Sequence, residues 1–262
     1  FGFNSNGQRL RIYAAGANFY TARNFPKKYW GQMLVNEPTG HLVHLAKIEE
    51  KGAGYIEVDG GNIFASTDEW TAPVFSETGP DGNIWVADWY NPVIQHNPDK
   101  RGMDNQIWND DKGKGNAHTN PLRDKGHGRI YIVKPKSGSE SKIESLSISN
   151  EDQLIEGLKS DNMFWRTTAQ RLIVENKLTS LTPMLTQLAN NDSYTAMHAL
   201  WTLNGLNALN TNTTNGLIEK ALKSNSLALQ KTAIKLLPKT EEGTALFLNS
   251  GVLTHNNLHV RL

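Results

Sequence analysis

Acidic, histidine and aromatic residues recur at the ends of apolar runs in the first half of the chain. Three of them have side chains that can exchange a proton with a substrate and are predicted to be catalytic: His41, Glu37 and Asp88. Seven others can make polar or ring contacts and are predicted to bind substrate: Asp68, Trp70, Trp89, Tyr90, His96, His118 and Arg123. Carboxylates, imidazoles and rings that converge on one concave site suit a polar, sugar-like substrate.

These residues can meet only if the surrounding strands bring their ends together. Residues 1–135 contain short apolar runs separated by turns, which predicts an all-β domain. One four-stranded sheet is expected from residues 14–20, 30–36, 41–46 and 55–66. The next sheet is expected to begin with residues 71–76, 83–88 and 128–133, with a Gly-Pro-Asp-Gly turn at 79–82. This order is typical of β-propeller blades, so residues 1–135 are predicted to form the last blades of a propeller.

A propeller would place the loops around the first two strands of each blade on one face. By this rule, seven residues should gather at one mouth of the central channel: Glu37, His41, Asp68, Trp70, Asp88, Tyr90 and His96. The segment 97–127, which holds His118 and Arg123, is too long for an ordinary hairpin loop and is expected to fold over that mouth.

Several of these residues also have structural interpretations. Asp68 and Asp88 could coordinate Ca²⁺ together with backbone carbonyls, or they could brace turns by accepting backbone N–H groups. His41 and His44 are expected to point to the same face of one strand, either as two metal ligands or as hydrogen-bonded histidines. Asp81 is expected to be a turn residue only.

Leu and Ala recur at helical spacing from Glu151 onward. Residues 136–150 are expected to be a linker, and 151–262 a second domain that is truncated at its C-terminus. Four cap-like residues recur at intervals of 31, 33 and 31 residues, each expected to cap the second helix of a pair: Asp161, Asp192, Asn225 and Asn256. Three ionisable residues are expected at the surface or between repeats: Arg166, His198 and Arg261. The period predicts an α-solenoid of HEAT-like helix pairs, and hence a β + α chain of two domains.

The composition narrows the function classes. The net charge is +1 with scattered Lys and Arg, which gives no electrostatic footprint for nucleic acid. No apolar run approaches the roughly 18 residues of a membrane span, so no transmembrane segment is expected in this chain. Cysteine is absent, which removes disulfides, thiolate metal sites and c-type haem attachment from this chain. Because the first residue is not Met and the last ones resemble the start of a helix, the chain is expected to be a fragment.

Four stretches carry a family resemblance: residues 36–44, 65–74, 79–90 and 128–133. Together with the helical repeats, they resemble bacterial secreted dehydrogenase-like proteins. In that family, a propeller akin to those of sorbosone and soluble quinoprotein glucose dehydrogenases is followed by HEAT repeats, often with a C-terminal haem c domain. The string from Asn36 to His44 and the one from Asp68 to Tyr90 are its more specific parts.

The resemblance implies an oxidoreductase parent protein, exported to the periplasm or the cell surface, that acts on sugars or polyols. It implies pyrroloquinoline quinone (PQQ) or haem c as cofactors of the parent, with the electron acceptor held outside this chain; Ca²⁺ is expected only if Asp68 and Asp88 coordinate it. No CxxCH motif is present, so a haem module would also lie outside it. The alternative is a non-catalytic propeller and HEAT module that recognises a protein or glycan partner. A cavity at the channel mouth would favour the enzyme, and a partner on the solenoid would favour the scaffold.

Overall fold

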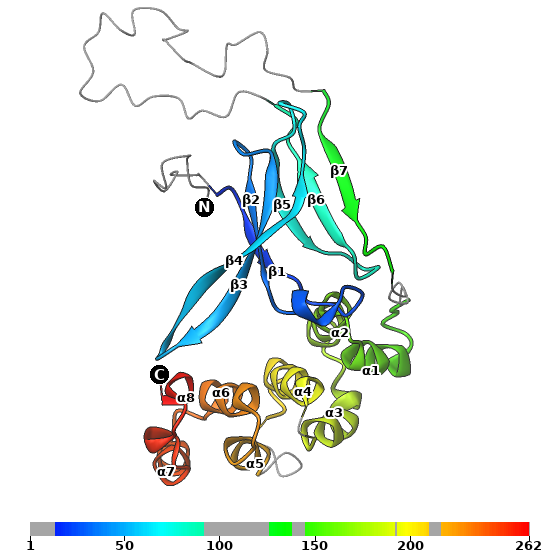
Figure 1. Cartoon of the computed structure of the whole chain (residues 1–262). Coiled ribbons are helices and arrows are strands. Elements are labelled where there is room, and N and C mark those ends of the chain that lie inside the picture. Colours follow the sequence, from blue (N-terminus) through cyan, green and yellow to red (C-terminus); the bar gives the residue numbers. More distant parts are fainter. Residues whose placement is uncertain (1–13, 92–125, 138–144, 192, 210–215, 262) are drawn as a thin grey trace, which may run out of the picture. The chain divides into compact units, whose positions relative to one another are not determined.

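The computed structural model describes residues 14–91, 126–137, 145–191, 193–209 and 216–261, and Figure 1 labels its helices and strands. The chain divides into two compact units. The first, called the β unit below, comprises residues 1–48 and 57–140. The second, called the helical unit, comprises residues 49–56 and 141–262. The chain is therefore α+β with two units.

The first sheet of the β unit has four strands in sequence order, β1 (Ala17–Phe19), β2 (Met33–Glu37), β3 (Leu42–Lys51) and β4 (Gly54–Ala65). A short 3₁₀ helix, η1 (Lys27–Tyr29), lies between β1 and β2. Pairing is antiparallel from β1 to β3. The four strands occur where the apolar runs predict them, although β1 is shorter than expected and β3 continues five residues further, to Lys51.

The second sheet has three strands in sequence order, β5 (Pro73–Thr78), β6 (Ile84–Asp88) and β7 (Arg129–Val133), all antiparallel. Asp81 holds the turn between β5 and β6, because its Oδ1 accepts hydrogen bonds from Asn83 N at 3.1 Å and Trp85 Nε1 at 2.9 Å. Burial raises the pKa of Asp81, but these bonds outweigh it and the pKa is lowered. A Cβ at Gly79 would lie 2.3 Å from Trp85 Nε1, so this turn needs glycine there. Asp81 is confirmed as a turn residue.

The two sheets pack over one apolar core, listed here by residue: Tyr20, Ala22, Phe25, Leu34, Val43, Leu45, Ile84 and Val86. Hydrogen bonds between distant segments fix the packing. The Tyr20 hydroxyl donates to Gly82 O at 2.9 Å, and Asn24 Nδ2 donates to Asp81 O at 2.7 Å. The β5–β6 turn is therefore fastened to the segment between β1 and β2.

The described part of the helical unit consists of helices in successive pairs, with no strand outside the hairpin residues 49–56. The pairs are α1 (Glu151–Lys159) with α2 (Met163–Glu175), α3 (Thr182–Ala189) with α4 (Tyr194–Gly205), α5 (Leu217–Leu222) with α6 (Leu227–Leu236), and α7 (Glu241–Asn249) with α8 (Leu258–Arg261). Short 3₁₀ helices, η3 (Thr179–Leu181) and η4 (Val252–Thr254), precede α3 and α8. The second helices contact one another in series, α2 with α4, α4 with α6, and α6 with α8. None of the helices described is long and apolar enough to cross a membrane.

The expected caps of the second helices are wrong by one residue. The side chains that accept N–H groups at these N-termini belong to the following residue in each case: Asn162, Ser193, Ser226 and Asn257. Asp161, Asn225 and Asn256 directly precede such a cap, and Asp192 lies outside the described residues. Since the offset is constant, the period of 31, 33 and 31 residues is unchanged.

The interior of the helical unit is apolar with a small polar insertion. Leu158, Leu181, Leu185, Leu200 and Leu203 are fully buried. His198 Nδ1 lies 2.8 Å from Gln170 Oε1, which joins α4 to α2, and the guanidinium of Arg166 lies 4.6 Å from the centre of the Tyr194 ring. Arg166 and His198 thus lie between helix pairs, one of the two expected places.

Candidate functional site

The ends of six strands meet at one edge of the two sheets of the β unit. In the first sheet, Glu37 at the end of β2 pairs with Leu42 at the start of β3. In the second, Asp88 at the end of β6 pairs with both Pro73 at the start of β5 and Arg129 at the start of β7. Antiparallel pairing therefore brings the flanking loops of each sheet to one edge.

Hydrogen bonds join these loops. Ser66, directly after β4, donates its N–H to His41 O at 3.0 Å. His41 Nδ1 lies 2.6 Å from Thr71 O, in the loop that leads into β5. A backbone carbonyl only accepts hydrogen bonds, so Nδ1 carries the proton and Nε2 of the half-buried ring is the acceptor nitrogen. The contact orients a potential proton acceptor at the strand ends.

Asp88 is a deeply buried charged group of this edge, with 3% of its surface exposed. Its Oδ1 accepts the N–H of Ala72 at 2.6 Å and the N–H of Tyr90 at 2.7 Å. Its Oδ2 is also buried, but has no hydrogen-bond partner in the part of the chain that the structure describes. Since buried carboxylate oxygens are costly without a donor, Oδ2 marks a position where a ligand donor would be stabilised.

Aromatic and charged side chains form a layered wall beside Asp88. The rings of Trp70 and Tyr90 lie 5.8 Å apart, and the guanidinium of Arg129 lies 3.5 Å from the centre of the Tyr90 ring. Arg129 Nη1 is also 3.7 Å from Asp68 Oδ2. Asp68 itself braces its loop, because its Oδ1 accepts the N–H of Trp70 at 3.0 Å. A flat wall of this kind can contact the C–H face of a sugar.

Two non-glycine residues of this edge have a left-handed backbone. His41 has a φ of 57° and Tyr90 a φ of 49°. This conformation costs about 1–2 kcal/mol for an ordinary L-residue, and bulky side chains adopt it rarely. The surrounding hydrogen bonds hold both residues in it, which is a common property of binding and catalytic sites.

Glu37 lies at the same edge, with 3% of its surface exposed. Burial raises the pKa of Glu37, and the hydroxyl of Thr39, 3.3 Å from both carboxylate oxygens, lowers it by a smaller amount. A carboxyl group with a raised pKa can act as a proton donor as well as an acceptor.

The structure thus brings five of the predicted site residues into one hydrogen-bonded and stacked group: His41, Asp68, Trp70, Asp88 and Tyr90. Glu37 ends β2 at the same edge, and Trp89 follows Asp88 with an exposed side chain. Three predicted residues lie outside the described residues: His96, His118 and Arg123. The catalytic and binding roles stay predictions.

The expected pairing of His41 with His44 is wrong. His41 precedes β3 and contacts Thr71, whereas His44 Nε2 lies 2.9 Å from Glu57 Oε1. Residues three apart along an extended strand point to opposite faces, so the two imidazoles do not share a side.

Two contributors to this edge were not predicted. Thr71 acts through its backbone oxygen, which leaves no trace in residue type. Arg129 is 41 positions after Asp88 in the chain and is brought to it by β6–β7 pairing. The signal that could have found Arg129 is its place as the first residue of the β-rich run 129–133, opposite the last residue of the preceding strand.

The described residues of this edge do not form a complete metal site. Within the described ranges, no three His, Cys, Asp or Glu side chains come together as metal ligands. The carbonyls next to Asp88 already accept hydrogen bonds, Thr71 O from His41 and Ala72 O from Trp89 N.

Comparisons with known proteins identify one region. Residues 9–137 match the model of a protein family described as a domain of unknown function (DUF7133). The match spans the seven described strands and ends before α1. No curated protein and no solved structure matches the chain.

Proposed function

We propose that the strand-end edge of the β unit binds a hydroxyl-rich small molecule, a sugar or a polyol, as part of an exported propeller oxidoreductase of the quinoprotein-like type. The electron acceptor, PQQ or haem c, is then held outside this chain. The observation that carries the proposal is the buried Oδ2 of Asp88, which has no partner among the described residues. No described side chain donates to this oxygen, and a ligand hydroxyl can supply the missing donor.

His41 gives the proposed site a place for a proton. Its Nδ1 is committed to Thr71 O, which leaves Nε2 as an acceptor. If a secondary alcohol is oxidised to a ketone here, Nε2 of His41 would accept the hydroxyl proton, and a two-electron acceptor such as PQQ, held outside this chain, would take up the hydride. Trp70 and Tyr90 would hold the apolar face of the sugar ring, and Asp88 Oδ2 a neighbouring hydroxyl.

The propeller part of the proposal is supported by an uncovered apolar face. Register places Phe75, Ala87 and Ile130 in one row across the second sheet, and Glu77, Trp85 and Ile132 in the next row of the same face. Ile130 is 69% exposed, Phe75 44% and Ile132 43%. An apolar sheet face of this kind is normally covered, and in a propeller the next blade covers it.

The solenoid part is supported by the recurrence of helix pairs and of their caps. Each described second helix begins after a side-chain cap, and successive second helices are in contact. Stacked pairs with nearest-neighbour contacts are typical of HEAT-like repeats. Export to the periplasm or the cell surface rests on the family resemblance alone.

The second candidate function is recognition of a glycan or protein without catalysis. It is favoured by the contact of His41, which is oriented by a backbone carbonyl rather than by a carboxylate. A carbonyl stabilises a protonated imidazole less than an aspartate does. On this alternative, Asp88 and the aromatic wall bind the ligand and no proton transfer follows.

Asp88→Asn tests the site directly. Asparagine keeps an oxygen for the N–H groups of Ala72 and Tyr90, but replaces Oδ2 by a donor. We expect the affinity of the chain for glucose or sorbitol, measured by saturation-transfer NMR, to fall about tenfold. Asp59→Asn is the matched control, since Asp59 Oδ1 accepts one N–H, that of Gly61, in an exposed part of β4. Unchanged binding by Asp88→Asn contradicts the proposal.

Trp70→Leu removes the ring and leaves Asp88 in place, so it keeps the test valid if Asp88→Asn fails to fold. We expect a severalfold loss of glucose affinity.

To separate the two functions, sugar oxidation with an artificial electron acceptor is compared between wild type and His41→Ala in the full-length protein. Loss of oxidation with retained binding supports the enzyme. Binding without oxidation in the wild type supports recognition.

A further inference from the structure

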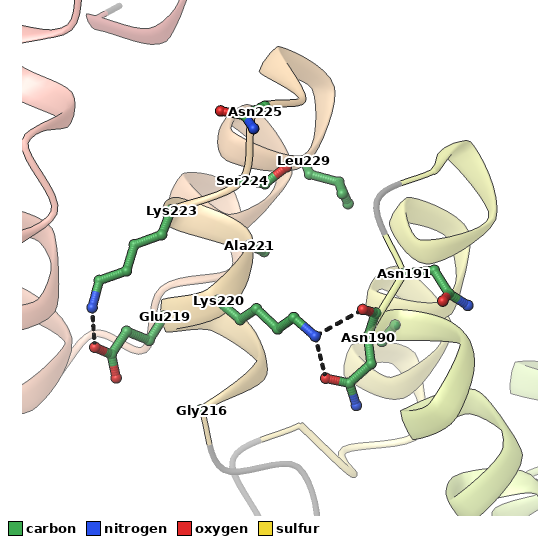
Figure 2. A pocket seen from close by; sticks show the side chains of 11 residues that line it. Asn190, Asn191, Gly216, Glu219, Lys220, Ala221, Lys223, Ser224, Asn225 and Leu229 are labelled. Carbon is green, nitrogen blue, oxygen red and sulfur yellow. Dashed lines mark hydrogen bonds and ion pairs between the residues drawn. The ribbon is translucent and has the colours of Figure 1, made fainter.

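A hollow of about 520 Å³ opens between two consecutive helix pairs of the helical unit (Figure 2). One wall is the end of α3, with Asn190 and Asn191, and the opposite wall is α5 with the turn that follows it. The most buried lining residues are apolar: Ala189, Ala221 and Leu229. The volume is that of a small-molecule site.

Lys220 extends from α5 to the end of α3 (Figure 2). Its Nζ donates to Asn190 O at 2.8 Å and to Asn190 Oδ1 at 3.1 Å. Both acceptors are neutral, and Lys220 has no carboxylate partner within the described ranges. The contacts therefore fix the ammonium group without giving it a carboxylate counter-ion, and one N–H remains.

The other charges of the hollow cancel. Lys223 Nζ lies 2.6 Å from Glu219 Oε1, one turn away on α5. Glu219 is the one acidic residue among the described lining residues, so the lining carries a net charge of +1. The side-chain amides of Asn191 and Asn225 also line the hollow, and neither makes a hydrogen bond in the part of the chain that is described. They supply further N–H donors.

We propose that this hollow binds a small organic monocarboxylate with a short apolar body. The carboxylate pairs with the fixed ammonium of Lys220 and accepts N–H groups of Asn191 or Asn225. The apolar body lies on Ala189, Ala221 and Leu229. A dianion such as phosphate is disfavoured, because only one positive charge of the lining lacks a carboxylate partner.

The test uses butyrate as the probe and butyramide as its neutral counterpart. Titrated into the chain, butyrate should shift the side-chain NH₂ signals of Asn191 and Asn225 in ¹H–¹⁵N spectra, with a dissociation constant on the order of 1 mM. Butyramide and inorganic phosphate should bind at least several times more weakly. Equal binding of butyramide, or tighter binding of phosphate, overturns the proposal.

Charge variants sharpen the assignment. Lys220→Met should weaken butyrate binding about fivefold, whereas Lys159→Met should not change it, since Lys159 is an exposed lysine of α1 paired with Glu156 at 2.6 Å. Because Lys220→Met also breaks the contact with Asn190, two further variants leave that contact intact. Glu219→Gln should strengthen binding and Lys223→Met should weaken it. The proposal is overturned if butyrate affinity is unchanged in Lys220→Met, Glu219→Gln and Lys223→Met. Asp88→Asn should not affect butyrate binding, so this site and the proposed sugar site fail independently.

Discussion

The side-chain hydrogen bonds that cap the second helices and those that join the strand segments of the β unit span very different chain separations. In the helical unit, Ser193 Oγ accepts the N–H of Ala196, and Ser226 Oγ that of Leu229, each three positions on. In the β unit, Asp88 Oδ1 accepts the N–H of Ala72, 16 positions away, and the Tyr20 hydroxyl reaches Gly82, 62 positions away. Local rules therefore specify each helix pair, whereas the strand ends depend on contacts between distant segments.

Residues with a left-handed backbone also occur at different places in the two units. Lys177 and Asn207 have φ values of 52° and 55°, and each directly follows a helix C-cap, where this conformation ends many helices. His41 and Tyr90 adopt it beside a buried carboxylate instead. The comparison teaches that backbone strain in the helical unit terminates helices, while in the β unit it is concentrated at the candidate site.

The largest effect we expect comes from the apolar core of the helical unit. Leu200 is fully buried in α4, which contacts α2, α3 and α6. Leu200→Ala should lower the free energy of unfolding of this unit by about 3 kcal/mol, because it removes buried methyl groups and leaves a cavity. Hydrogen-exchange mass spectrometry in denaturant would measure this in peptides from 151–261.

The reciprocal variant is Leu34→Ala, in the core of the β unit. It should lower the hydrogen-exchange protection of peptides from the strands and leave the protection of peptides from the helices unchanged. If either variant lowers protection equally in both units, the units do not unfold separately, and the contrast between local and distant specification fails.

A comparable effect should follow from acid in the helical unit. Burial, with the nearby charge of Arg166, lowers the pKa of His198 from 6.5 to about 4. The unfolded chain therefore binds a proton at this residue below pH 6.5, but the folded chain only below about pH 4. Stability falls as the pH drops between these values, by about 3 kcal/mol. Denaturation followed by circular dichroism at 222 nm, at pH 7.5 and pH 4.5, would show it.

His198→Gln is the matched variant, because glutamine retains a polar group next to Gln170 and does not titrate. It should remove most of the extra acid sensitivity. A wild-type and variant pair with the same pH dependence would show that His198 is not held neutral in the folded state.

Strand positions could be predicted from the sequence because alternation and turn residues act locally, as the turn at Asp81 shows. The caps could not be resolved to one residue, since Asp161 and Asn162 are both good capping types and only the backbone selects Asn162. At the site, His41 and Asp88 could be predicted from their places at strand ends. Thr71 and Arg129 could not, because one acts through its backbone and the other through pairing across 41 positions.

We expect an intermediate effect on the stability of the β unit from Asp88, which joins segments that are distant in the chain. Asp88→Ala leaves two N–H groups, those of Ala72 and Tyr90, without their acceptor. We expect the β unit to lose about 2 kcal/mol of stability, because each buried N–H without an acceptor is costly. The loss is not larger because the variant also removes Oδ2, a buried oxygen that has no hydrogen-bond partner among the described residues. Asp88→Asn should retain most of the stability. Thermal unfolding of the two variants measures the difference, and equal losses would mean that the carboxylate does not brace this edge.

The smallest effect we expect is the pH dependence of stability through Glu37, and its sign is opposite to that of His198. Burial raises the pKa of Glu37, so the folded β unit binds a proton at this carboxyl at a higher pH than the unfolded chain does. Its contribution to stability is therefore greatest below the ordinary pKa of glutamate and is lost as the pH rises through the raised value. Glu37→Gln, which cannot ionise, should stabilise the β unit at pH 7.5 and change it little at pH 4. Hydrogen exchange in peptides from 33–46 at both pH values would measure this, with Glu77→Gln on the exposed face of β5 as the control.

Because acid weakens the helices through His198 and relieves the strands at Glu37, lowering the pH should narrow any stability advantage of the helical unit. A loss of stability on acidification through Glu37 itself would show that hydrogen bonds such as that from Thr39 outweigh burial in setting the pKa of this carboxyl.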